Sequence, residues 1–272
     1  MINQKCQLKN GRELKPNKRL GQNFLVNKGI IEKMISAAEL IPDDTVIEIG
    51  PGLGALTLAL AKKVKKVIAV EKDRGLIKHL QVKLVNEKIN NVQLMGSDIL
   101  DFQPSNCPQQ YKIVANLPYY ITKPVIMMFL AAQQPPESMI LMIQKEVAQR
   151  ICATPPQSNK LAIFTQFFCQ PKIISYVSKN SFWPAPKVDS AIIKIVPSDK
   201  YKKQVDQDIF SKIVTAGFSQ PRKQVLNNFS RALKFTKEQT QKWLMANHIS
   251  PTQRAENLSL NDWIRLSNSF GN

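Results

Sequence analysis

The sequence is poor in the residues that bind structural metals and form disulfide bonds. Its 272 residues include only two histidines, His79 and His248, and four cysteines that lie far apart without a CxxC pair. This shortage argues against a zinc site and against a cysteine–histidine nucleophile. We therefore expect a metal-free protein with reduced cysteines.

The sequence also lacks long apolar segments. Its longest apolar run, around Val125–Ala132, is much shorter than the roughly 18–20 residues that a membrane-spanning helix requires. The first residues, MINQKCQLKN, contain no apolar stretch of the kind found in a secretory signal. These absences predict a cytoplasmic protein that does not associate with a membrane.

Acidic residues are scarce relative to basic ones. Lysine and arginine number 38 against 20 aspartate and glutamate residues, so the formal net charge is +18. The excess lies at the ends, because residues 1–28 carry a net +6 and residues 200–272 a net +7. Such a field favours a nucleic-acid partner, since binding to phosphates releases counterions. Solubility alone needs only about 2–8 charges on a small domain, and the basic segments lack the apolar side that membrane binding requires.

Short β-branched runs alternate with helical patterns in the first half of the chain. Asn27 can cap a helix that runs to about Leu40, and Thr45–Ile49 follows as a buried strand. The further predicted strands are Val67–Val70, Val92–Met95, Lys112–Ala115 and Met139–Ile143, and the further predicted helices are Leu56–Lys63, Arg74–Glu87, Pro124–Ala132 and Lys145–Ile151. This alternation predicts an α/β fold with parallel strands and helices on both faces. Two later runs, Ile163–Phe168 and Ala191–Val196, are predicted to form an antiparallel edge.

The composition changes near Pro197–Lys203, where PSDKYKK has the character of a linker. The chain beyond it contains helical patterns without strand-like runs, and one helical face carries Val225, Leu226, Phe229 and Leu233. Ser259 and Asp262 form a capping-box pattern ahead of a last helix, Trp263–Ser267. We predict a basic N-terminal segment (1–28), an α/β domain (29–198) and an all-helical domain (199–272).

The sharpest local motif is a glycine-rich turn after the first predicted strand. It places Gly50, Gly52 and Gly54 in the sequence EIGPGLG, just ahead of a helix. Glycines at this place let a ligand approach the backbone in nucleotide-binding folds. The spacing GxGxG differs from the dinucleotide pattern GxGxxG, and the carboxylate of Glu48 would repel a pyrophosphate. A tight strand–helix turn without a ligand is the alternative interpretation.

Two further strand ends carry acidic residues. Glu71 ends the second strand, where a carboxylate about 20 residues after the glycine turn hydrogen-bonds ribose hydroxyls in sheets of this type. Asp98, followed by Ile99, ends the third strand and can accept a hydrogen bond from an adenine amine. Together with the glycine turn, these residues predict a purine nucleoside without phosphates at the carboxyl edge of the sheet.

The fourth strand ends in NLPYYIT, which contains Asn116, Pro118 and Tyr119. An exocyclic adenine amine is a poor nucleophile because its lone pair is delocalised into the ring. An asparagine oxygen and a backbone carbonyl beside proline can accept both amine hydrogens, and an aromatic ring can stack on the base with about 1–3 kcal/mol. This chemistry needs neither a metal nor a strong general base. A proline-shaped loop with aromatic packing is the alternative interpretation.

With these motifs in place, the sequence resembles the ribosomal RNA adenine N6,N6-dimethyltransferases, and among them the small-subunit (16S) branch. The resemblance covers nearly the whole chain. Its motifs are KRLGQNFL (Lys18–Leu25), EIGPGLG (Glu48–Gly54), Val70–Asp73, Gly96–Ile99, Asn116–Thr122, QKEVAQRI (Gln144–Ile151) and FWPAPKVDS (Phe182–Ser190), and it extends into Gln220–Asn228 and Arg254–Leu260. Seven motifs in the family's order make the resemblance specific.

The resemblance implies a Rossmann-like class I methyltransferase sheet that binds S-adenosylmethionine, followed by a helical RNA-binding domain. The implied substrate is a pair of adjacent adenines near the 3′ end of 16S rRNA, in the small ribosomal subunit or its precursor, and we expect a monomer. The implied cofactor-binding residues are Asn23, Leu25, Gly50, Gly52, Gly54, Glu71, Asp98, Ile99 and Asn116. The implied target-binding residues are Asn116, Pro118 and Tyr119 at the amine and Phe182 on the base, in a loop stiffened by Pro184 and Pro186.

Two other functions fit single motifs. A nucleotide-dependent oxidoreductase fits the glycine turn and Glu71, but the GxGxG spacing, the NLPYY loop and the basic C-terminal region argue against it. A non-enzymatic RNA-binding or ribosome-assembly factor fits the charge, but the intact NLPYY loop and glycine turn favour an enzyme. The chain departs from the resembled family in one place, because a short Tyr-Gly-containing insertion usual between the positions of Lys160 and Leu161 is missing. None of the implied site residues lies there.

Overall fold

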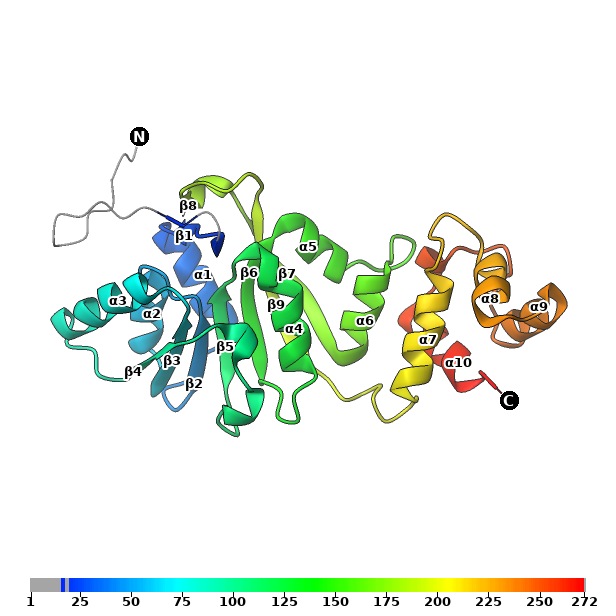
Figure 1. Cartoon of the computed structure of the whole chain (residues 1–272), viewed down its shortest axis with the longest axis horizontal. Coiled ribbons are helices and arrows are strands. Elements are labelled where there is room, and N and C mark those ends of the chain that lie inside the picture. Colours follow the sequence, from blue (N-terminus) through cyan, green and yellow to red (C-terminus); the bar gives the residue numbers. More distant parts are fainter. Residues whose placement is uncertain (1–15, 18–19, 272) are drawn as a thin grey trace. The chain divides into compact units, whose positions relative to one another are not determined.

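The computed structural model describes residues 16–17 and 20–271 of the chain (Figure 1). Most of the basic segment predicted at residues 1–28, with Lys18 and Arg19 of the first motif, lies outside the described residues. Contacts divide the chain into two compact units, one up to Lys145 with Ile173–Ile195, the other Glu146–Lys172 with the chain from Val196 onward. The sequence-based domain boundaries stay a prediction. No helix within the described residues is long and apolar enough to cross a membrane.

The main sheet has seven strands in the order β4-β3-β2-β5-β6-β9-β7. In chain order these strands are β2 (Thr45–Ile49), β3 (Lys66–Glu71), β4 (Val92–Gly96), β5 (Lys112–Asn116), β6 (Ser138–Gln144), β7 (Cys169–Val177) and β9 (Ser190–Pro197). Strands β2 to β6 pair in parallel, and β9 runs antiparallel to β6. This sheet confirms the α/β fold predicted from the alternation, including the antiparallel run at residues 191–196.

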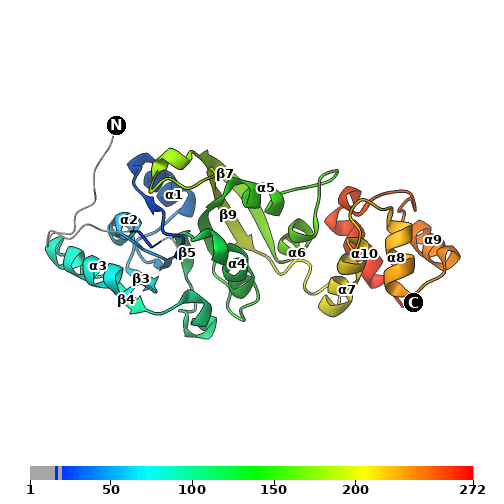
Figure 2. The same cartoon turned by 45° about the horizontal axis from the view of Figure 1, so that its top comes forward.

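Helices cover both faces of this sheet. The helices of the first half of the chain are α1 (Lys28–Ala38), α2 (Ala55–Ala61), α3 (Arg74–Asn86), α4 (Thr122–Leu130) and α5 (Lys145–Ile151). The predicted cap of α1 is present, since the side chain of Asn27 accepts a hydrogen bond from the backbone N–H of Ile30. One core cluster packs Met34 of α1 and Leu60 of α2 against strand residues such as Val67 and Ile140. Helix α4 lies on the opposite side of the sheet from α1 (Figure 2).

The segment predicted as a strand at Ile163–Phe168 is a helix, so that prediction is wrong. It belongs to α6 (Lys160–Phe168), and the edge strand β7 follows it directly. The side chain of Asn159 caps α6 by accepting a hydrogen bond from the N–H of Ala162. Ile163 and Phe167, four residues apart, are both buried in one cluster with helices of the C-terminal region. Burial of this helical face outweighs the strand preference of β-branched and aromatic residues.

The C-terminal region is helical, as predicted. It contains α7 (Gln207–Gly217), α8 (Val225–Leu233), α9 (Lys237–Ala246) and α10 (Leu260–Asn268). The predicted apolar face is present on α8, where Val225 and Phe229 are fully buried. The predicted capping box at Ser259 and Asp262 opens α10 through bonds in both directions. The indole of Trp263 stacks on Phe218 with ring centroids 5.2 Å apart, so it sits at the centre of this core.

Candidate active site

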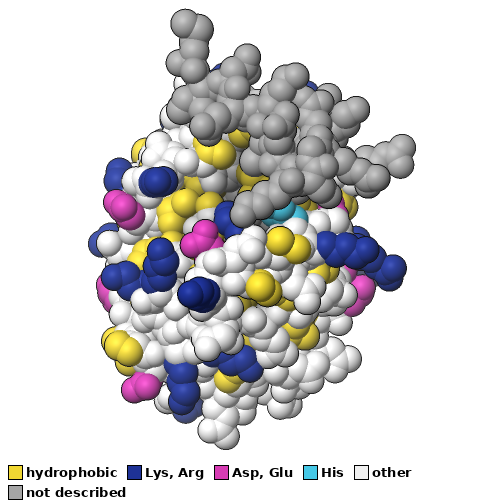
Figure 3. Space-filling model, turned by 90° about the vertical axis from the view of Figure 1, so that its left-hand side faces the viewer, with side chains coloured by type: hydrophobic (Ala, Val, Ile, Leu, Met, Phe, Trp, Pro, Cys, Tyr) yellow, Lys and Arg dark blue, Asp and Glu magenta, His cyan; other side chains and the backbone are white. Residues whose placement is uncertain are grey.

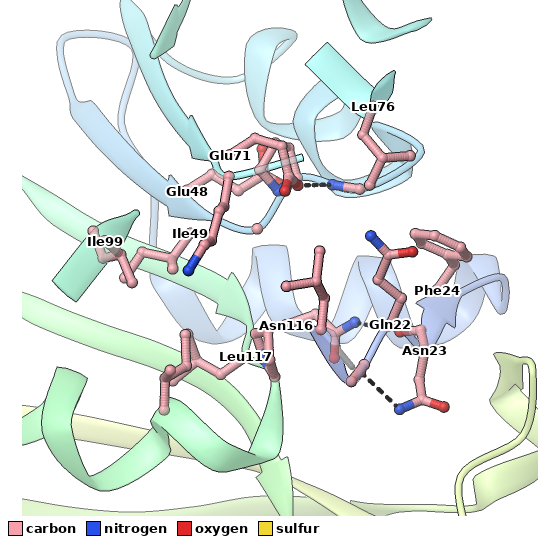
Figure 4. A pocket seen from close by; sticks show the side chains of 18 of the residues that line it. Gln22, Asn23, Phe24, Glu48, Ile49, Glu71, Leu76, Ile99, Asn116 and Leu117 are labelled. Atoms are coloured by element: carbon pink, nitrogen blue, oxygen red, sulfur yellow. Dashed lines mark hydrogen bonds between the residues drawn. The ribbon is translucent and has the colours of Figure 1, made fainter. Parts of the chain in front are cut away.

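A pocket lies at the carboxyl ends of β2, β3, β4 and β5. Its wall includes every site residue predicted from the sequence except Gly54: Asn23, Leu25, Gly50, Gly52, Glu71, Asp98, Ile99, Asn116, Pro118, Tyr119 and Phe182. Figure 4 shows Glu48 and Glu71 on one side of this pocket and Asn116 and Leu117 on the other. The structure therefore brings the predicted cofactor residues and the predicted target residues to one cavity.

The three glycines of the turn have different surroundings. All three have positive φ angles, +68° at Gly50, +57° at Gly52 and +79° at Gly54, which disfavour any other residue. A Cβ atom at Gly52 would lie only 2.9 Å from the ring of Phe24, so the turn and the N-terminal strand are closely packed. At Gly54 it would collide with Leu80 of α3. Gly54 therefore lies behind the turn, against a helix, and not on the pocket wall.

Glu71 is buried and held by the backbone. Its Oε1 accepts a hydrogen bond from the N–H of Asp73 at 2.9 Å, and its Oε2 accepts one from the N–H of Gly52 at 3.3 Å. Burial raises the pKa of this carboxyl, and the backbone bonds to residues 73 and 52 partly offset that effect. A carboxylate oxygen has room for more than one donor, so Glu71 can also accept from a pair of hydroxyl groups.

Glu48 is a second buried carboxyl in the pocket wall, which the sequence analysis treated only as an obstacle to a pyrophosphate. Its side chain is 1% exposed, and the hydroxyl of Thr57 lies beside it. Burial raises the pKa of Glu48 to about 8, and the contact with Thr57 offsets part of this effect. The neutral, protonated form of this carboxyl is therefore favoured below that pH, because burying the charged form is costly. Its position before the glycine turn was the available sequence signal.

Asp98 is engaged by two partners within the protein. Its Oδ1 accepts a hydrogen bond from the N–H of Leu100, and its Oδ2 lies 2.5 Å from Nζ of Lys72. The Lys72 ammonium, chiefly through this hydrogen bond, lowers the pKa of Asp98. Lys72 also lines the pocket. A ligand donor could bind Asp98 only through a remaining lone pair or by replacing Lys72, a partner that the sequence does not predict.

Asn116 is the last residue of β5, and its side-chain amide is oriented by the N-terminal segment. Its Nδ2 donates a hydrogen bond to the backbone carbonyl of Asn23 at 3.0 Å (Figure 4). This bond leaves Oδ1 as the acceptor that the side chain offers to a ligand. Two residues after Asn116, the carbonyl of Pro118 accepts a hydrogen bond from the N–H of Ile121 at 3.2 Å. That bond closes a short turn that holds Tyr119 at the pocket.

Phe182 reaches the pocket through a pairing that the sequence did not predict. It lies in β8 (Phe182–Trp183), which pairs antiparallel with β1 (Phe24–Leu25), so that Leu25 faces Phe182 and Phe24 faces Trp183. The rings of Phe24 and Trp183 stack with centroids 6.1 Å apart. Gln22, also missed, donates a hydrogen bond from Nε2 to Asp73 at 2.9 Å. The KRLGQNFL motif was the signal for this segment, but its partners are too distant in sequence to infer.

The arrangement has the chemistry of a nucleoside site joined to an amine site. One side is formed by the backbone of the glycine turn and by buried carboxyl groups. The other side is formed by the amide oxygen of Asn116 beside the ring of Tyr119. Within the described residues, no three histidine, cysteine, aspartate or glutamate side chains are grouped so that they could hold a metal ion.

Comparisons with known proteins agree with this chemistry. A family model described as ribosomal RNA adenine dimethylase matches residues 13–272. A protein of Dehalococcoides mccartyi (strain CBDB1) named ribosomal RNA small subunit methyltransferase A is 43% identical over 270 residues, which cover 98% of this chain and 92% of that protein. A protein of the same name from Clostridium botulinum (strain Langeland) is 40% identical over 261 residues, covering 94% of each chain.

Two solved structures share the fold over most of this chain. A dimethyladenosine transferase from Plasmodium falciparum superposes with a TM-score of 0.76 and 28% identity, covering 89% of this chain and 95% of that one. The 23S rRNA methyltransferase ErmE superposes with a TM-score of 0.74 and 25% identity, covering 90% of this chain and 98% of that one.

Proposed function

The chain belongs to the ribosomal RNA adenine dimethylase family, and from this premise we propose the substrate and the residue roles of its pocket. It is an S-adenosylmethionine-dependent rRNA adenine N6,N6-dimethyltransferase. Its substrate is a pair of adjacent adenines in the 3′-terminal hairpin of 16S rRNA, modified during biogenesis of the small ribosomal subunit. Similarity over 98% of the chain to a protein named ribosomal RNA small subunit methyltransferase A supports this assignment.

The first side of the pocket fits the cofactor. S-adenosylmethionine supplies a methyl group carried on a sulfonium when it is bound. Glu71 would accept from the ribose hydroxyls, and Asp98 with Ile99 would hold the adenine ring. The backbone at Gly50 and Gly52 would lie against the nucleoside, with Gly54 supporting the turn from behind. The bare backbone of Gly50, whose φ of +68° disfavours any side chain, is the observation that favours a ligand lying against this turn.

The remaining cofactor contacts come from the other chain segments at the pocket. Asn23 and Leu25 would close the cofactor site from the N-terminal side, and Asn116 would contact the cofactor where it meets the target. Asn23 is itself ordered, since its Nδ2 donates a hydrogen bond to the carbonyl of Gly21 at 3.0 Å.

The second side fits the target base. The Oδ1 of Asn116 and the backbone carbonyl beside Pro118 would accept the two hydrogens of the adenine amine, so that its lone pair points at the methyl group. Tyr119 and Phe182 would stack on the two faces of the base. Positioning of the amine in line with the methyl group is the main catalytic contribution.

The charged ends of the chain would hold the RNA. The predicted helical domain, residues 199–272, carries a net +6 with most of its lysine and arginine side chains exposed, and residues 1–28 add +6. Lysine and arginine side chains are also spread over the face shown in Figure 3, with acidic side chains between them. The adenines would leave their stack to enter the pocket. We further propose that the protein acts as a cytoplasmic monomer.

The main support for this proposal is the hydrogen bond from Asn116 Nδ2 to the carbonyl of Asn23. It leaves Oδ1 of Asn116 as an acceptor for a ligand in the same pocket that Glu71 lines. The test is incubation with labelled S-adenosylmethionine and small ribosomal subunits that lack the modification, followed by mapping of the methylated bases. We expect two adjacent dimethyladenines in 16S rRNA. Methylation of large-subunit RNA instead, or no transfer to either subunit, would contradict the proposal.

A further inference from the structure

Two hydroxyl groups meet behind the target side of the pocket. The hydroxyl of Tyr119 and Oγ of Ser190 are 2.8 Å apart, although 71 positions separate them in the chain. Ser190 is fully buried, whereas Tyr119 is half-buried and lines the pocket. Ser190 itself is not part of the pocket wall. The hydroxyl of Tyr119 is therefore directed out of the pocket, and its ring remains on the wall.

Ser190 is a rigid partner. It is the first residue of β9, and it faces Gln144 across the antiparallel pairing of β6 and β9. The residue before it is held twice: the carbonyl of Asp189 accepts from the N–H of Lys145, and its Oδ1 accepts from the N–H of Lys179, both at 3.0 Å. Tyr119, in contrast, lies in a short turn after β5, with two rotatable side-chain bonds. The contact thus ties a loop side chain to the sheet.

The bond persists at ordinary pH. Burial raises the pKa of Tyr119, and the hydrogen bond to Ser190 offsets only part of this effect. The phenol therefore stays protonated in neutral solution and can either donate to Oγ or accept from it.

We propose that Ser190 is a positioning residue that fixes the plane of the Tyr119 ring against the target adenine. This inference rests on the proposed function, since it assigns to Tyr119 the stacking role given above. Stacking requires a defined ring plane at the moment when the amine is aligned with the methyl group. A ring that rotates about its side-chain bonds would present that plane only part of the time, so the loss should appear in the rate of transfer.

The test is a double-mutant cycle with Ser190→Ala, Tyr119→Phe and the double variant. Single-turnover methyl transfer from labelled S-adenosylmethionine to undermethylated small subunits gives the rate, and calorimetry gives cofactor affinity. Each single variant should lower the rate about fivefold, the value of one net hydrogen bond, and the double variant should be no slower than the slower single one. Cofactor affinity should stay within about twofold of wild type, below the loss of one net hydrogen bond.

Two controls separate positioning from general damage. Ser190→Thr keeps the hydroxyl and should recover most of the rate. Ser138→Ala removes another buried serine, at the opposite end of the neighbouring strand β6, and should leave the rate unchanged. Thermal unfolding of all variants shows whether each is folded.

Three results would overturn the inference. They are an unchanged rate in Ser190→Ala, a double variant whose loss is the product of the two single losses, or a fall in cofactor affinity equal to the fall in rate. A wild-type protein that methylates no small-subunit RNA would instead overturn the proposed function. The two failures are therefore distinguishable in one set of assays.

Discussion

The two sides of the pocket are built in different ways. On the cofactor side, Glu71 is held by the backbone of Gly52 and Asp73, at the ends of adjacent parallel strands. On the target side, Asn116 is held by Asn23, and Tyr119 by Ser190, through contacts between distant parts of the chain. Substitutions on the cofactor side should mainly weaken cofactor binding. Substitutions on the target side should mainly lower the rate of methyl transfer.

The largest effect should come from Asn116→Ala. Removing the acceptor oxygen should lower the single-turnover rate by about 10²–10³-fold, as for other deletions of one electrostatic contact to a developing charge. Asn116 is also one of several proposed cofactor contacts, so calorimetry should find some loss of cofactor affinity, but a loss much smaller than the fall in rate. Asn106→Ala, an exposed asparagine outside the pocket, is the matched control. A folded Asn116→Ala enzyme with a near wild-type rate would show that Asn116 does not hold the target amine during methyl transfer.

Glu71→Ala should have the opposite signature. The loss of one charge-assisted hydrogen bond to the ribose, with about 1.5–3 kcal/mol, should weaken S-adenosylmethionine binding about 10–100-fold in calorimetry. At saturating cofactor, the rate should approach that of the wild type. Glu87→Ala, an exposed carboxylate at the end of α3, should change neither quantity. Unchanged cofactor affinity in Glu71→Ala would show that Glu71 does not bind the ribose of the cofactor.

Added salt should weaken binding of the small ribosomal subunit about tenfold more than binding of the cofactor. Binding to small subunits should weaken with a log–log slope of about −0.7 to −0.9 per neutralised phosphate, so two phosphates correspond to about tenfold between 50 and 200 mM salt. Cofactor binding, measured in the same buffers, should change much less because no phosphate is involved. A flat salt profile for the ribosomal subunit would contradict the RNA-holding role of the basic ends.

A last effect, on stability and not on activity, concerns the dependence on pH. Between pH 4.5, its ordinary pKa, and about 8, Glu48 keeps a proton in the folded state that the unfolded chain has released. Wild-type stability should therefore fall as pH rises through this window. Glu48→Gln should reduce that slope, and urea unfolding at pH 5, 6.5 and 8 measures it. Equal slopes in the two proteins would show that Glu48 is ionised and has a partner in solution.

The sequence predicts most of the sheet because the parallel strands are short runs rich in β-branched and apolar residues, bounded by turn signals. The bounds of the strand Thr45–Ile49 and of the helix Lys145–Ile151 match the structure residue for residue. The helix at Ile163–Phe168 was predicted as a strand, because its β-branched and aromatic residues have strand preference and the cap at Asn159 was overlooked. Tertiary burial, which no local pattern contains, decides such cases.

The cofactor side was also easier to predict than the target side. Glu71 and Asp98 follow strands whose carboxyl ends must meet, so their convergence at one pocket needs only the fold. The partners Ser190, Asn23 and Lys72 could not be inferred, since each depends on how a distant loop is placed. The roles of the site residues themselves stay predictions until the variants above are measured.

The pairing of β1 with β8 bears on how an active molecule arises during synthesis. Leu25 emerges from the ribosome early, but its partner Phe182 and the anchor Ser190 emerge only after the parallel strands. A nascent chain that ends before residue 182 contains the glycine turn and the carboxylates, yet it lacks part of the wall against which the base would rest. The target side is therefore completed last, so competence to bind cofactor should precede competence to methylate RNA as the chain grows.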